Sequence, residues 1–174
     1  MVADQLSRAL SQAPKAQSVS GRRGNRPAGG VAPRIVTGES EGEASVRLAL
    51  QAAFGLWEDG GEVVPELMPF AHEGKRYRVD YALPRHGYYV EVDGWAFHGF
   101  TKEAHHSDRI RGLYFSARGW LPFRVSHGQA TQNPHILIEA LQEAMALSDP
   151  APRDSISIVP VPHKHGVWHR LDHR

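Results

Sequence analysis

The chain has 174 residues, of which 41% are hydrophobic, and a formal net charge of +1, which suits one folded domain with some excess. It contains no cysteine, so disulfides and cysteine-based zinc or iron–sulfur sites are excluded, and a cytoplasmic location is expected. No apolar run reaches the length of a membrane span and no signal-peptide pattern opens the sequence, so no membrane partner is expected.

The charges are distributed unevenly along the sequence. Residues 1–37 contain six Lys or Arg against one acidic residue, and residues 151–174 contain four against two. The middle of the chain contains ten basic and 16 acidic residues. This pattern suits a chain that binds a polyanion through its basic ends and holds a metal at its acidic centre. Solubilising tails would explain the same charge distribution.

The expected elements begin after residues 1–37, which lack hydrophobic periodicity and are predicted to be a disordered basic arm. Ser40 and Glu43 have the spacing of a capping box and predict a helix that runs to Gly55. The elements expected after it, in chain order, are strands over Val63–Phe70, Tyr77–Leu83 and Tyr88–Asp93, a helix from Thr101 or Ser107 to Ala117, a strand over Trp120–Val125, and a helix capped at Asn133 and ending at Leu147.

This order predicts an α/β fold with a mixed sheet flanked by helices. Pro122 favours an edge position for the fourth strand, since proline cannot donate a ladder hydrogen bond. The predicted division is a basic arm over 1–37, a folded domain over 38–148, and a Pro/His-rich tail over 149–174. The tail is expected to be loop-like, with at most one edge strand.

Acidic residues interrupt two of the predicted strands. Asp80 stands between Val79 and Tyr81, and Glu91 and Asp93 project from one face of the next strand. Strands disfavour Asp, and clustered carboxylates repel each other and are costly to desolvate. A divalent cation relieves both problems, so Asp80, Glu91 and Asp93 are candidate ligands for Mg²⁺, with Mn²⁺ as a substitute. Asp93 also precedes a glycine, and Asp-Gly is a common turn pair.

Four stretches of the chain resemble the PD-(D/E)XK nuclease superfamily. The closer resemblance is to the very-short-patch-repair-like endonucleases of DNA repair (Vsr-like) and to a related uncharacterised bacterial domain family. The stretches are Gly42–Gly55, YRVDYALP, VEVDGWAFH and Ser107–Val125. The resemblance covers residues 39–147 and implies a restriction-endonuclease-like αβββαβ core. The implied activity is that of a Mg²⁺-dependent DNA endonuclease or nickase, a hydrolase acting on phosphodiester bonds.

The resemblance also implies roles for individual residues. Asp80 and Glu91 would bind the metal with help from Asp93, and His98 would be the general base for the attacking water, supported by Asp108. The resemblance also makes Glu43 an active-site position, although the capping box alone accounts for a Glu there. The helix dipole likewise favours an acid at Asp108 without a catalytic role. The candidate DNA-binding residues are Arg22, Arg23, Arg26, Lys102 and Arg109.

The chain departs from the superfamily pattern at one important position. A typical site has Lys two residues after the Glu, and here that position is Asp93. The cysteine ligands of the repair enzymes' structural zinc are also missing. These departures leave a second function open, which is that of a catalytically silent accessory protein of a defence, repair or mobile-element system. Such a protein would bind DNA, or a protein partner through its tails.

Overall fold

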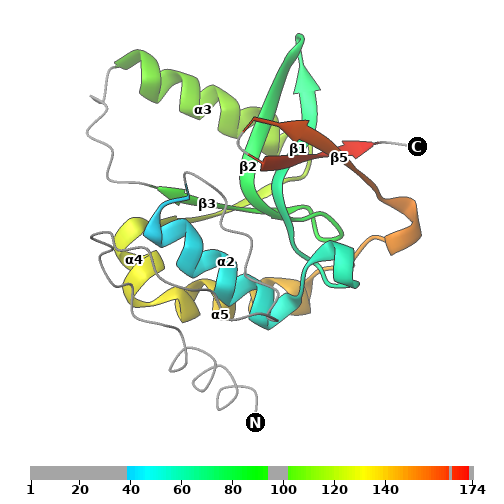
Figure 1. Cartoon of the computed structure of the whole chain (residues 1–174). Coiled ribbons are helices and arrows are strands. Elements are labelled where there is room, and N and C mark those ends of the chain that lie inside the picture. Colours follow the sequence, from blue (N-terminus) through cyan, green and yellow to red (C-terminus); the bar gives the residue numbers. More distant parts are fainter. Residues whose placement is uncertain (1–38, 94–101, 165, 173–174) are drawn as a thin grey trace, which may run out of the picture.

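The computed structural model describes residues 39–93, 102–164 and 166–172, with the side chains of 102–105 left out. It is an α/β structure in which helices flank a six-stranded mixed sheet (Figure 1). The predicted fold class is confirmed at this level. Within the described ranges, no helix is long and apolar enough to cross a membrane.

The sheet has the strand order β4-β3-β2-β1-β6-β5. Neighbouring strands run antiparallel except for two parallel pairs, β3 with β4 and β1 with β6. The elements in chain order are α2 (Glu41–Phe54), η1 (Trp57–Asp59), β1 (Val64–His72), β2 (Lys75–Leu83), β3 (Tyr88–Asp93), α3 (Lys102–Ser116), β4 (Leu121–Ser126), α4 (His127–Gln132), α5 (Pro134–Leu147), η2 (Arg153–Ser155), β5 (Ser157–His163) and β6 (Gly166–Asp172).

Local signals account for most of the element boundaries. The Ser40 side chain accepts a hydrogen bond from the Glu43 amide, and the Glu43 carboxylate accepts one from the Ser40 amide, which completes the predicted capping box. Pro134 occupies the first turn of α5 as predicted. The strand that contains Pro122 is β4, which lies at the edge of the sheet, so that prediction is also confirmed.

Two hydrophobic clusters fix which face of the sheet each helix covers. One cluster joins α2 and α5 to Tyr81 and Val90, and the other joins Phe115 of α3 to Tyr89. Figure 1 shows α3 on the opposite side of the sheet from α2, α4 and α5. Side chains alternate along a strand, so Glu91, two residues after Tyr89, projects toward the α3 face.

The structure corrects two expectations. The short helix α4 was not predicted, because its sequence HGQATQ has no apolar periodicity; a second capping box, formed by Ser126 and Gln129, begins it. Residues 149–174 were expected to be loop-like with at most one edge strand; the edge strand is present as β5, but the described residues also form β6, which pairs with β5 and with β1. Pro160 and Pro162 suggested a loop, yet both lie in β5, an edge strand, where proline is tolerated.

Candidate functional site

Asp80 lies where the pairing between β2 and β3 ends. The two strands pair from Tyr81 opposite Val90 to Leu83 opposite Tyr88. Beyond this point, Oδ2 of Asp80 accepts a hydrogen bond from the Val92 amide at 2.9 Å. The carboxylate therefore bridges the two strands and is held in place by the β3 backbone.

The surroundings of Asp80 disfavour its charged form. Burial is the main cause that raises the pKa of the carboxyl from 3.8 to about 6; the Val92 hydrogen bond opposes this, and the negative charges of Glu91 and Glu43 add to it. Three of the predicted acidic residues, Asp80, Glu91 and Glu43, are therefore close enough to repel one another at the Asp80 carboxylate. A cation placed there would relieve the desolvation and the repulsion together.

Glu91 is neutralised by an arginine that the sequence analysis did not select. Nη1 of Arg111 donates to Oε2 of Glu91 at 2.9 Å, and Nη2 donates to Oε1. The side chains of Arg111 and Glu91 are 20% and 15% exposed. Nη2 of Arg111 also donates to the carbonyl oxygen of Arg78 at 2.8 Å. This bidentate pair ties α3 to the sheet directly at the candidate site.

A second arginine, Arg124, links two more predicted residues. It stands opposite Glu91 in the parallel pairing of β3 with β4. Its Nη2 donates to Asp93 Oδ1 at 2.8 Å, and its Nη1 donates to Asp108 Oδ2 at 2.9 Å. Nε lies 4.0 Å from Oε2 of Glu91. The hydrogen bond to Asp93 is the largest cause that raises the pKa of Arg124, opposed by partial burial and reinforced by Asp108.

Glu43 is held by the helix cap. Its Oε2 lies 2.6 Å from the Ser40 amide, so the capping explanation describes its main contact. The Tyr81 hydroxyl donates to the Glu43 carbonyl oxygen at 2.9 Å and fixes the first turn of α2 beside β2. The negative charge of Glu43 still contributes to the raised pKa of Asp80. Glu43 therefore borders the site electrostatically while its carboxylate serves the cap.

Several predicted residues cannot be placed in this arrangement. His98 and the arm residues Arg22, Arg23 and Arg26 lie outside the described residues, and so does the side chain of Lys102. Arg109 is exposed on α3 and makes no hydrogen bond or ion pair with any residue that the structure describes.

The carboxylates of Asp80 and Glu91 are the donors that a metal ion would use at this site. Among the described residues, no group of three or more His, Cys, Asp or Glu side chains is arranged to hold a metal ion. A site with fewer protein ligands fits better, because Mg²⁺ usually keeps several waters and needs only one or two carboxylates. Asp80 fits that role, since within the described part of the chain its Oδ1 makes no hydrogen bond. Glu91 fits if it shares its oxygens with Arg111 or releases them.

The two arginines are the residues that sequence reasoning missed. Arg111 follows Asp108 by three residues and so lies on the same side of α3, which is a weak local signal. Arg124 reaches the site through the register of β3 against β4, which no local pattern encodes. Both place a guanidinium at Glu91 or Asp93.

The chain was compared with known proteins in three ways. No protein-family model, no curated protein and no solved structure matches it. The resemblance to PD-(D/E)XK nucleases therefore remains an expectation from the sequence motifs, and the function has to be argued from the chemistry of the site.

Proposed function

We propose that the chain is a metal-dependent DNA endonuclease or nickase that hydrolyses phosphodiester bonds and uses Mg²⁺ bound by Asp80 and Glu91. One observation carries the proposal. A partly buried carboxylate is held at 2.9 Å by the Val92 amide near the charges of Glu91, Glu43 and Arg78, and within the described residues no cationic side chain is bound to it. Such a buried charge is costly for folding, so its presence favours a role in binding a cation.

Each part of the proposed chemistry has a candidate residue. When bound, Mg²⁺ would polarise the phosphate and lower the pKa of the attacking water. Arg111 and Arg124 would supply the positive charge that the superfamily takes from its Lys, because a guanidinium pairs well with phosphate oxygens. His98 is proposed from the sequence alone to take the proton from water. Asp93 and Asp108 would orient Arg124.

The experiment is cleavage of supercoiled plasmid DNA by the full chain with Mg²⁺. The expected result is conversion to nicked or linear DNA, and Asp80→Asn should lower the rate by about 100-fold or more, since it removes a metal ligand without changing side-chain size. Asp154→Asn is the matched control, because Asp154 is an exposed acidic residue of η2 and makes no contact with the site residues within the described structure. Equal cleavage by the wild type and Asp80→Asn would refute the proposal.

A second function is favoured by a different observation. Both oxygens of Glu91 are engaged by Arg111, an arrangement that holds the site together without a metal. A catalytically silent DNA- or partner-binding accessory protein would keep such a pair. Binding of short duplexes, with no cleavage under Mg²⁺ or Mn²⁺, would favour this function over the first.

A further inference from the structure

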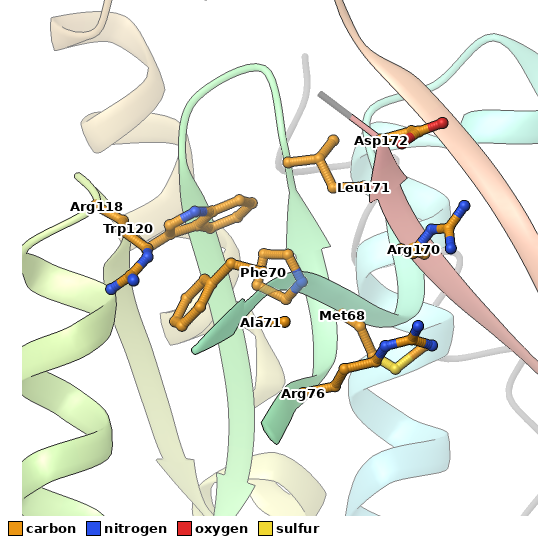
Figure 2. A pocket seen from close by; sticks show the side chains of 10 residues that line it. Met68, Phe70, Ala71, Arg76, Arg118, Trp120, Arg170, Leu171 and Asp172 are labelled. Carbon is orange, nitrogen blue, oxygen red and sulfur yellow. The ribbon is translucent and has the colours of Figure 1, made fainter. Parts of the chain in front are cut away.

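A pocket of about 850 Å³ opens on the α3 side of the sheet. Its lining comes from β1, β2, β6 and the turn between α3 and β4 (Figure 2). Three arginines from three separate parts of the fold, Arg76, Arg118 and Arg170, contribute to it, and we call it the arginine pocket. Asp172 is the one acidic residue in its lining. The pocket therefore carries an excess of positive charge and suits an anionic ligand.

Among the described residues, one nitrogen of Arg170 is left without a hydrogen-bond acceptor. Its Nε is buried and has no hydrogen-bond partner in the described structure. An unpaired buried donor of this kind is destabilising, because the group loses its water and gains nothing in return. Arg118 is only partly engaged: Nη1 donates to the Tyr114 carbonyl oxygen at 3.1 Å, and Nη2 lies 3.4 Å from Nδ1 of His72. A phosphate in the pocket would add acceptor oxygens for the guanidinium groups of Arg118 and Arg170, which both line it.

The floor of the arginine pocket is apolar. Met68 and Trp120 belong to it, together with Phe70, whose ring centroid lies 4.4 Å from the Arg118 guanidinium carbon. Figure 2 shows Arg118 and Trp120 on one side of the pocket, Arg170 on the other and Phe70 between them. A bare phosphate would leave this floor uncovered. A ligand with both a flat apolar ring and a phosphate matches the floor, the charge and the volume together.

A series of cation–π and edge-to-face contacts connects the arginine pocket to the candidate site. The Arg111 guanidinium, which binds Glu91, lies 4.8 Å from the Phe115 ring centroid. Phe115 packs against Phe70 with ring centroids 4.8 Å apart, and Arg118 covers Phe70. Arg111 lies in α3 and Arg118 in the turn just after its end at Ser116, so both arginines lie toward the end of the same helix.

We propose that the arginine pocket binds one unpaired nucleotide of a DNA strand, with its phosphate on Arg118 and Arg170 and its base against the apolar floor. The choice of DNA as the polymer rests on the proposed function. The expected consequence is a preference for single-stranded DNA or an unpaired end over a blunt duplex, since a paired base cannot enter a concave pocket.

The test measures binding without cleavage. The full chain in EDTA is titrated into fluorescently labelled DNA of about 12 nucleotides, as a single strand and as a blunt duplex, and anisotropy is followed over a range of salt concentrations. Arg170→Met should weaken single-strand binding by about tenfold and reduce the slope of log affinity against log salt by about 0.7. Its melting temperature should equal or exceed that of the wild type, because the variant removes a buried unpaired donor.

A control variant and a second pocket variant distinguish binding in the arginine pocket from non-specific electrostatic attraction to DNA. Lys164→Met removes one exposed positive charge at the turn between β5 and β6, and it should change single-strand affinity by less than about twofold. Arg118→Gln should behave as Arg170→Met does. A phosphate-bearing mononucleotide should compete better than inorganic phosphate or an acidic peptide.

Two results would overturn the proposal. The first is single-strand affinity in Arg170→Met and Arg118→Gln that matches the wild type; the second is an equal loss of affinity for the single strand and the blunt duplex. Because EDTA prevents turnover, neither result depends on cleavage. Failure of the plasmid assay with intact pocket binding would refute the proposed function alone.

Discussion

Replacing Arg111 with Met removes the ion-pair partner of Glu91. The variant tests whether Arg111 and Mg²⁺ compete for the Glu91 carboxylate. The pair is mostly buried, with side chains 20% and 15% exposed. Removing one partner of a fully buried pair costs about 3–5 kcal/mol, and an exposed pair contributes about 0.2–1 kcal/mol. Since Arg111→Met also loses the hydrogen bond to the Arg78 carbonyl, we expect unfolding free energy in EDTA to fall by about 2–3 kcal/mol.

Magnesium should recover part of this loss. Without Arg111, Glu91 keeps, within the described structure, only the Arg124 Nε atom at 4.0 Å from its Oε2 and can join Asp80 in binding a cation. A ligand at ten times its dissociation constant stabilises the native state by about 1.4 kcal/mol. Arg111→Met should therefore gain more stability from Mg²⁺ than the wild type does, because in the wild type the arginine competes for the same oxygens.

The assay is urea unfolding followed by circular dichroism, in EDTA and in Mg²⁺. Arg109→Met is the matched control, since Arg109 is exposed on the same helix and makes no ion pair within the described structure; it should stay within about 0.5 kcal/mol of the wild type. The double variant Asp80→Asn/Arg111→Met should lose the magnesium effect. Wild-type stability of Arg111→Met in EDTA, or an equal response of both proteins to Mg²⁺, would refute the reasoning.

Three further predictions follow from the same contacts. The pKa of Asp80 is raised from an ordinary 3.8 to about 6, so between these pH values the native state binds more protons than the unfolded state does. The contribution of Asp80 to the unfolding free energy therefore falls by up to about 3 kcal/mol as pH rises from 4 to 6. In urea titrations, Asp80→Asn should lack this loss. Arg124→Leu should lower the unfolding free energy by less than about 1 kcal/mol, because the ion pairs of Arg124 with Asp93 and Asp108 are exposed. The same variant should lower the rate of plasmid cleavage by about tenfold. Ser40→Ala should lower stability by about 1 kcal/mol in thermal unfolding by removing the α2 cap, and unchanged stability would contradict the capping geometry.

Local chemistry explains which parts of the fold were predictable. The Ser40–Glu43 capping box and Pro134 at the start of α5 are encoded within a few residues, so α2 and α5 could be predicted almost to their ends. The strand β3 was predicted over its full length, Tyr88–Asp93, from its aromatic and β-branched residues. Of the hairpin β5–β6, the edge strand β5 was anticipated, but β6 was missed, because its pairing with β1 joins residues that are distant in sequence.

Some residues of the candidate site could likewise be predicted from local sequence, and others could not. Asp80 and Glu91 could be selected because acidic residues in apolar strands conflict with local preference, and a short turn joins the two strands. Arg111 and Arg124 could not, because they reach the acidic residues through the packing of α3 and the register of β4. Asp93 was visible in the sequence, but the guanidinium group that pairs with it required the tertiary structure.

The most direct test of the central claim is a crystal structure of the chain with Mn²⁺ and a short DNA strand, read by anomalous diffraction. The account predicts one anomalous peak between Oδ1 of Asp80 and the Glu91 carboxylate, with Arg111 displaced from at least one Glu91 oxygen. A map with no peak there, and with Arg111 still bound to both oxygens of Glu91, would contradict it.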